Sequence, residues 1–143
     1  MIFSLQELFS NAQAVTATAV STNVLNLGKP GTPNGASAPI AFDAGKGNRI
    51  PLWISVVESF NNLTSLTISV EVDDNEAFSS ATSIFTSPAY TLAQVAAGAR
   101  NLLPTEIPIN TNEQFVRLRY TVAGTAPTLG KITAGVVMGR QEH

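Results

Sequence analysis

The stretch LTSLTISVEVD (residues 63–73) decides the fold class, because it alternates between apolar and polar side chains from residue 66 onward. Leu66, Ile68 and Val70 are separated by single polar residues. This period of two places apolar side chains on one face of a strand and polar side chains on the other. The stretch therefore predicts an antiparallel strand with one face on a core and the other toward water.

The preceding stretch, IPLWISVVESF (residues 50–60), is the longest apolar run of the chain. Its even-numbered side is wholly apolar up to residue 56, whereas the other side combines Trp53 and Val57 with serines. Such a run predicts a central strand that is covered on both faces or nearly so. Asn61 and Asn62 separate the two stretches and predict that they form a hairpin.

The rest of the chain shows further short strand patterns between Gly, Pro and Asn turns. These patterns cover residues 13–28, 40–43, 114–122 and 129–138. Residues 29–39 predict a loop, because prolines cannot donate to a sheet ladder. Residues 89–100 favour a strand or a loop over a helical turn. About eight short strands predict an all-β fold: a jelly-roll-like antiparallel β-sandwich, with a barrel as the other closed solution.

The first twelve residues differ from the remainder. Ser4 and Glu7 have the spacing of a helix capping box, which predicts an N-terminal arm or short helix. The segment gathers five large apolar residues: Ile2, Phe3, Leu5, Leu8 and Phe9. It packs either on its own domain or on a neighbouring protein molecule. The first is favoured, because ordered terminal segments usually pack on their own domain. We expect an N-terminal arm (1–12) and a single β-sandwich domain (13–143).

Composition restricts the classes of function. The 143 residues carry a net charge of −2, and only 13% of them are charged. The eight Lys and Arg are scattered, so neither a nucleic-acid surface nor a membrane patch is expected. The N-terminus lacks the basic region of a signal peptide, and no apolar stretch reaches membrane-spanning length. A neutral surface rich in Thr, Ser and Asn suits contact with another protein, or simply a small β domain with Thr-rich strands.

Catalytic machinery is not expected. The single histidine is His143, the last residue, and the chain has no cysteine. Nucleophilic schemes that need a histidine base and zinc sites are therefore disfavoured, and we expect neither a cofactor nor a metal. The carboxylates that remain show no pairing: Asp43, Glu58, Asp73, Asp74, Glu76, Glu106 and Glu113.

Three other features have both a functional and a structural interpretation. The acids of VDDNEAF (residues 72–78) are a conceivable calcium site, but their spacing favours a turn bonded to its own backbone. Arg117 and Arg119 share one strand face, where they either clamp an acidic partner or form salt bridges across strands. Trp53 is the only tryptophan, and a lone Trp in an apolar strand is usually core.

Four stretches resemble a known family: TATAVSTNVLNLG (16–28), IPLWISVVESF (50–60), SLTISVEVDDNEAF (65–78) and FVRLRYTVAGTAPTLGKITAGVV (115–137). They are similar to the capsid cement, or decoration, proteins of short-tailed bacteriophages of the Bordetella-phage type. The resemblance implies a jelly roll that binds the outside of an icosahedral shell and bridges major capsid protein subunits. It also implies a place on the virion exterior and a small homo-oligomer, with a dimer favoured.

The family's contact residues do not transfer to this chain, because no short motif defines them. From this sequence alone, the predicted partner-binding residues are the five N-terminal apolar residues together with Arg117 and Arg119. The alternative is a carbohydrate- or receptor-binding sandwich module, which predicts aromatic side chains such as Trp53 and Tyr90 exposed on one sheet face.

Overall fold

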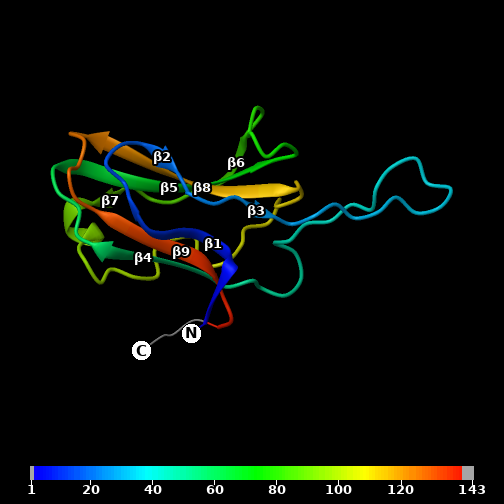
Figure 1. Ribbon diagram of the computed structural model, residues 1–143, viewed down its shortest axis with the longest axis horizontal. Helices are drawn as coiled ribbons and strands as arrows, with labels where there is room; N and C mark the ends of the chain where they lie inside the picture. Colours follow the sequence, from blue (N-terminus) through cyan, green and yellow to red (C-terminus); the bar gives the residue numbers. More distant parts are fainter. Residues whose placement is uncertain (1, 140–143) are drawn as a thin grey trace.

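The computed structural model describes residues 2–139 and shows two antiparallel sheets that face each other (Figure 1). This arrangement confirms the predicted all-β sandwich. The elements in chain order are β1 (Phe3–Ala14), β2 (Ala19–Val20), β3 (Leu25–Asn26), β4 (Leu52–Glu58), β5 (Leu63–Asp73), β6 (Thr82–Thr86), β7 (Tyr90–Thr91), the 3-10 turn η1 (Leu92–Val95), β8 (Phe115–Gly124) and β9 (Lys131–Val137).

One sheet has the strand order β1-β9-β4, and the other has the order β2-β8-β5-β6. Strand β3 also pairs with β8, and β7 pairs with β5. The long pair β5–β8 runs from Leu63 opposite Gly124 to Asp73 opposite Phe115. The even-numbered apolar side chains are buried between the sheets as predicted, apart from the half-buried Val122. The predicted wet face of β5 is only partly present, because Ser69, Glu71 and Asp73 are also buried. These two strands form the centre of the larger sheet.

The core lies between the sheets and receives side chains from both. Its most deeply buried large members are Phe9, Leu52, Ile54, Leu66, Ile68, Leu118, Tyr120 and Ile132. A hydrogen bond of 2.8 Å between the hydroxyls of Ser10 and Tyr120 crosses from β1 to β8 inside this core. Apolar packing and one satisfied polar pair therefore hold the sheets together.

The hairpin predicted for residues 50–73 is wrong, because β4 and β5 lie in different sheets. The cause is in the connection. The Asn61 side-chain oxygen Oδ1 accepts hydrogen bonds from the backbone N–H groups of Thr128 and Leu129, and its side-chain Nδ2 donates to the Thr128 hydroxyl. Asn62 takes a positive φ of 63°, and Phe60 is buried. The Asn pair thus ties the chain to the β8–β9 turn and sends it across the sandwich.

The N-terminal helix is also wrong, because residues 3–14 form strand β1. Between Phe3 and Leu8 the register with β9 shifts, and in this bulge Leu5 becomes 81% exposed. The Ser4–Glu7 spacing falls inside the bulge. Pairing with β9 satisfies the backbone that a helix would otherwise satisfy. The segment packs on its own domain, the favoured alternative, and the strand runs two residues beyond the expected end of the arm.

Strand β4 ends its sheet in strand order, yet its outer edge is occupied. The irregular segment 98–107 bonds along it, through Val56 N to Ala99 O at 2.8 Å and Leu52 N to Thr105 O at 3.0 Å. The predicted covered faces are largely present, since four of the seven residues of β4 are buried, but the predicted central position is wrong because β4 lies at the edge of its sheet in strand order. Residues 89–100 hold β7 and η1, so they contain both a short strand and a helical turn. Residues 40–43, a possible strand in the sequence, form no strand.

Candidate functional site

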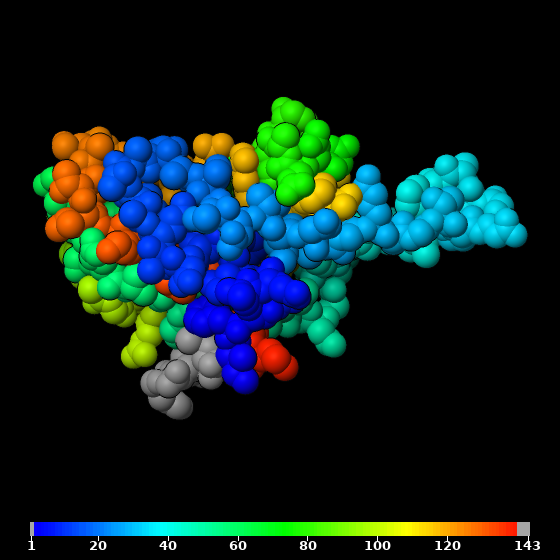
Figure 2. Space-filling model, in the orientation of Figure 1, coloured from blue at the N-terminus to red at the C-terminus, as the bar shows by residue number. Residues whose placement is uncertain are grey.

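The most prominent surface feature is a loop between β3 and β4, here called the projecting arm (residues 29–42). It leaves the sandwich at one end and extends well beyond the body of the molecule (Figures 1 and 2). Every residue from 31 to 41 is exposed. Two backbone hydrogen bonds lie within it: Ala36 N to Pro33 O at 3.0 Å closes a local turn, and Ile40 N to Gly31 O at 3.3 Å joins its two sides. The arm is thus a narrow out-and-back excursion with little contact to its own domain.

The base of the arm is held firmly by Asp43. Its carboxylate accepts backbone N–H groups from Gly45 at 2.9 Å, Asn110 at 2.8 Å and Thr111 at 3.1 Å. Burial by itself raises the pKa of this carboxyl, but the three N–H donors together with the charge of Lys46 outweigh it and lower the pKa below the usual value. Asp43 is therefore ionised near neutral pH and serves as a latch between two loops.

A close approach of the backbone reinforces the latch. A Cβ atom on Gly45 would lie 1.9 Å from the carbonyl oxygen of Pro108, so only glycine fits there. Ala44 N also donates to Thr111 O at 2.9 Å. The returning end of the arm is thereby fixed against residues 108–111.

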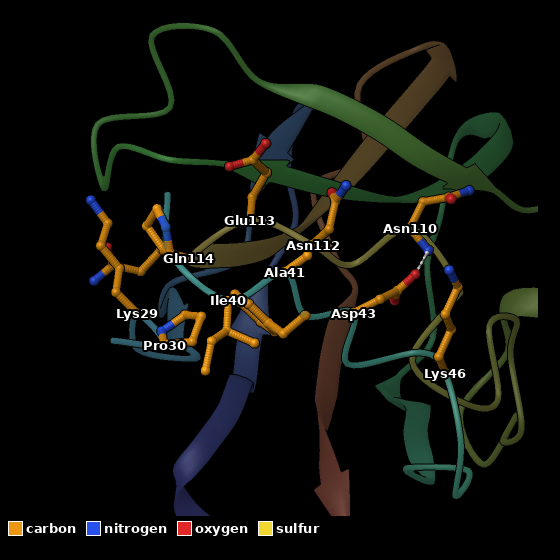
Figure 3. A pocket seen from close by; sticks show the side chains of 12 residues that line it. Lys29, Pro30, Ile40, Ala41, Asp43, Lys46, Asn110, Asn112, Glu113 and Gln114 are labelled. Atoms are coloured by element: carbon orange, nitrogen blue, oxygen red, sulfur yellow. Dashed lines mark hydrogen bonds between the residues drawn. The ribbon is translucent and has the colours of Figure 1, made fainter. Parts of the chain in front are cut away.

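A groove of about 470 Å³ lies at the base of the arm. Figure 3 shows its mixed lining, with Asp43 bonded to Asn110 on one side and Lys29 and Gln114 on the other. The groove combines charges of both signs with the apolar side chain of Ile40. Its hydrogen bonds hold loops in place, and the side chains form no nucleophile–base pair.

The structure divides the N-terminal residues predicted to bind a partner. Phe9 and Leu8 are buried, at 1% and 8% exposure, and Phe3 is half-buried. Only Ile2 and Leu5 are exposed, at 66% and 81%. Of this set, therefore, the two exposed side chains alone are accessible to another molecule.

Arg117 and Arg119 are engaged within the chain. Both guanidinium groups bond the carboxylate of Glu71 on the neighbouring strand, Arg117 at 2.7 Å, and Arg117 also stacks 4.1 Å over the ring of Phe78. The side chains of Glu71 and Arg117 are only 10% and 13% exposed. The cross-strand salt bridge, the structural alternative for this pair, is therefore present.

The other carboxylates with contacts also serve the fold. Glu58 bonds Lys131 at 2.6 Å, and this contact lowers the pKa of the Glu58 carboxyl. In the VDDNEAF turn, Asp73 accepts N–H groups from Asn75 and Ser80, as the turn interpretation predicts. Within residues 2–139 no group of three or more His, Asp or Glu is placed to hold a metal ion. His143 lies outside the described residues.

Trp53 is 5% exposed on the outer face of the smaller sheet, away from the main core. It pairs with Gly135, and a Cβ on that glycine would lie 3.2 Å from Cδ1 of Phe3. The missing side chain at Gly135 thus leaves room for the Phe3 ring. Every aromatic side chain from residue 2 to 139 is buried or half-buried. No helix in this part of the chain has the length and apolar character to cross a membrane.

The sequence predicts a loop at residues 29–39, and this loop is present, but its projection away from the sandwich was not predicted. The available signal was the lack of any large apolar residue between Lys29 and Ile40. A loop with nothing to bury has no reason to lie back on the core.

The fold and surface define a class of architecture: a two-sheet β-sandwich that presents one projecting arm, which carries no charged side chain from residue 30 to residue 42. The chain belongs to the Bbp16 family, whose model matches residues 9–136, both sheets and the arm included. The family name points to a Bordetella phage protein and states no function. A search of curated proteins found no match.

Proposed function

We propose that this chain is a non-catalytic structural protein of a phage virion, which binds the outer surface of the capsid and bridges neighbouring major capsid subunits. The observation that carries the proposal is the Bbp16 match over residues 9–136. It agrees with the resemblance to capsid cement proteins, which rests on stretches distributed over the same range. The phage association is thus supported by the whole domain and not by one motif.

The chemistry of the surface supports a contact of this kind. Charged residues make up 13% of the chain, and the best-defined acids are already paired with Lys131, Arg117, Arg119 or backbone N–H groups. A surface with a low share of charged residues has little charge to desolvate when it is covered. Neutral hydrogen-bonding side chains form wet interfaces at low cost.

Stabilisation follows by mass action. A protein that binds the assembled lattice but not free subunits stabilises the assembled state by RT ln(1 + [L]/Kd), about 2.7 kcal/mol per site at a hundredfold excess over Kd. Many copies on one shell multiply this effect. A dimer, the favoured oligomer, would carry two capsid-binding surfaces on each unit. Sedimentation velocity measures whether the purified protein is a dimer.

The test adds purified protein to undecorated capsids and sediments them, with unassembled major capsid protein as the control. We expect saturable co-sedimentation with capsids only, and a higher temperature of capsid disruption once the protein is bound. If the protein stays in the supernatant at micromolar concentrations, the proposed function is wrong.

The carbohydrate-binding alternative loses its main support, because it requires exposed aromatic side chains. Trp53 is buried, and Tyr90 is half-buried with its hydroxyl accepting the Leu103 N–H at 2.8 Å. No other observation favours that alternative.

A further inference from the structure

The projecting arm is built to be presented rigidly. On the outgoing side, Leu27 N donates to Gln114 O at 2.8 Å, and β3 pairs with β8. On the returning side, the Asp43 latch fixes the chain to residues 108–111. Both ends of the arm are therefore attached to the sandwich, and its direction is set by the fold.

The arm itself is neutral and stiffened. From residue 30 to residue 42 it contains no charged side chain, and Pro30, Pro33 and Pro39 restrict its backbone. Gly35 forms its tip at a φ of +83°. Prolines reduce the freedom that a segment loses on binding, so a stiff arm binds at lower entropic cost than a flexible loop.

The arm leaves its polar backbone and one apolar side chain without cover from its own domain. Ile40 is 56% exposed, and the two hydrogen bonds across the arm engage only part of its N–H and C=O groups. Six residues from base to tip, at about 3.3 Å each, give a reach of at most about 20 Å. This reach is enough to pass beyond the footprint of the sandwich and enter a crevice in a partner.

We propose that the projecting arm anchors the protein by lying in a neutral crevice between adjacent major capsid subunits. This inference rests on the proposed function and names the part of the surface that performs it. The partner surface should offer backbone-like hydrogen-bonding groups and small apolar side chains, because residues 30–42 of the arm have no charge with which to recognise an ionic site. A crevice between subunits exists only in the assembled lattice, which gives selectivity for capsids over free subunits.

The test shortens the arm without disturbing its base. Gly31 O and Ile40 N are already hydrogen-bonded, so replacing residues 32–39 with Asn-Gly makes them the first and last residues of a β-turn. We expect the midpoint of thermal unfolding to stay within about 2 °C of the parent. The affinity for undecorated capsids should fall at least tenfold in co-sedimentation.

A point variant makes the same test with the arm at full length. Ile40→Asp places a charge in the neutral arm and should weaken capsid binding by a similar factor. Leu129→Asp is the matched control, because Leu129 has nearly the same exposure (53% against 56%) and lies at the other end of the sandwich. The control should bind capsids as the parent does.

The outcomes separate the two proposals. If the parent binds capsids and the shortened variant binds equally well, the arm inference is wrong and the proposed function stands. If the parent itself does not bind, both fall. If shortening the arm turns an oligomer into monomers in sedimentation velocity, the arm is exchanged between copies of this chain, and the capsid contact is refuted.

Discussion

The buried hydrogen bond between Ser10 and Tyr120 predicts an asymmetric response to mutation. Both side chains are 0% exposed, and their hydroxyl oxygens lie 2.8 Å apart. Ser10 Oγ also lies 2.7 Å from Oε1 of Gln13, an oxygen that only accepts. The Ser10 proton therefore goes to Gln13, and Tyr120 must donate to Ser10.

The two truncations leave different groups without a partner. Tyr120→Phe removes the donor but leaves Ser10 bonded to Gln13, so it should cost about 1 kcal/mol. Ser10→Ala buries the tyrosine hydroxyl without an acceptor, which should cost about 2 kcal/mol. In a chain of this length these losses correspond to roughly 3 °C and 6 °C in the midpoint of thermal unfolding. The double variant should lose less than the sum, because no orphaned hydroxyl remains.

Urea unfolding measures these differences, with the fluorescence of the buried Trp53 as the signal. The reasoning is refuted if Tyr120→Phe proves more destabilising than Ser10→Ala. Alkaline pH adds a second readout. Burial raises the pKa of the Tyr120 hydroxyl. A tyrosine in the unfolded chain ionises near pH 10. Above that pH the unfolded state gains stability, so the parent should weaken more steeply than Tyr120→Phe.

Other perturbations follow from the contacts of single residues. Glu71→Gln leaves two guanidinium groups without a counter-charge and should lower the free energy of unfolding by about 3 kcal/mol in the same urea assay. The Arg119 side chain is 36% exposed, so Arg119→Gln should lower it by about 1 kcal/mol or less. Gly45→Ala forces a clash with a carbonyl oxygen and should cost about 2–3 kcal/mol, whereas Gly31→Ala meets nothing within 4 Å and should leave the thermal midpoint unchanged. Asp43→Asn should be less stable than the parent at pH 7. Because the folded pKa is lowered, the stabilisation is present above the unfolded value of about 3.9 and is lost as pH falls through the lowered folded pKa, so the denaturant midpoints of the two proteins should approach each other as the pH is lowered below the unfolded value.

Local sequence patterns predicted those features of the fold that depend only on residues close together in the sequence. The alternation of residues 63–73 determines which side chains of β5 face the core, because that choice is a property of the strand alone. Which strand pairs with which depends on distant groups. Asn61 prevents a β4–β5 hairpin by bonding Thr128 and Leu129, more than sixty residues away. No turn signal in the sequence reveals such a contact.

The same division explains the N-terminus and the arginines. Ser4 and Glu7 suit a helix locally, but the edge of β9 offers the segment backbone partners at both ends of the bulge, and tertiary pairing overrides the cap. The shared face of Arg117 and Arg119 was visible in the sequence. Their partner was not, because Glu71 lies opposite Arg117 only once the β5–β8 register is known.

The sheet edges supply an independent reason to look to the arm for binding. A partner strand adds to a sheet only where an edge has free N–H and C=O groups. The outer edge of β4 is bonded to residues 98–107 over most of its length. On β1, Asn23 takes the carbonyl groups of Leu8 and Phe9 through its side-chain and backbone N–H. Strand addition along the two edges of the smaller sheet is thereby restricted, which favours side chains and loops as the contacts there. Of the described loops, the arm extends furthest from the sandwich, and it carries no charge beyond Lys29 at its base, so its outer part meets a partner first and at low desolvation cost.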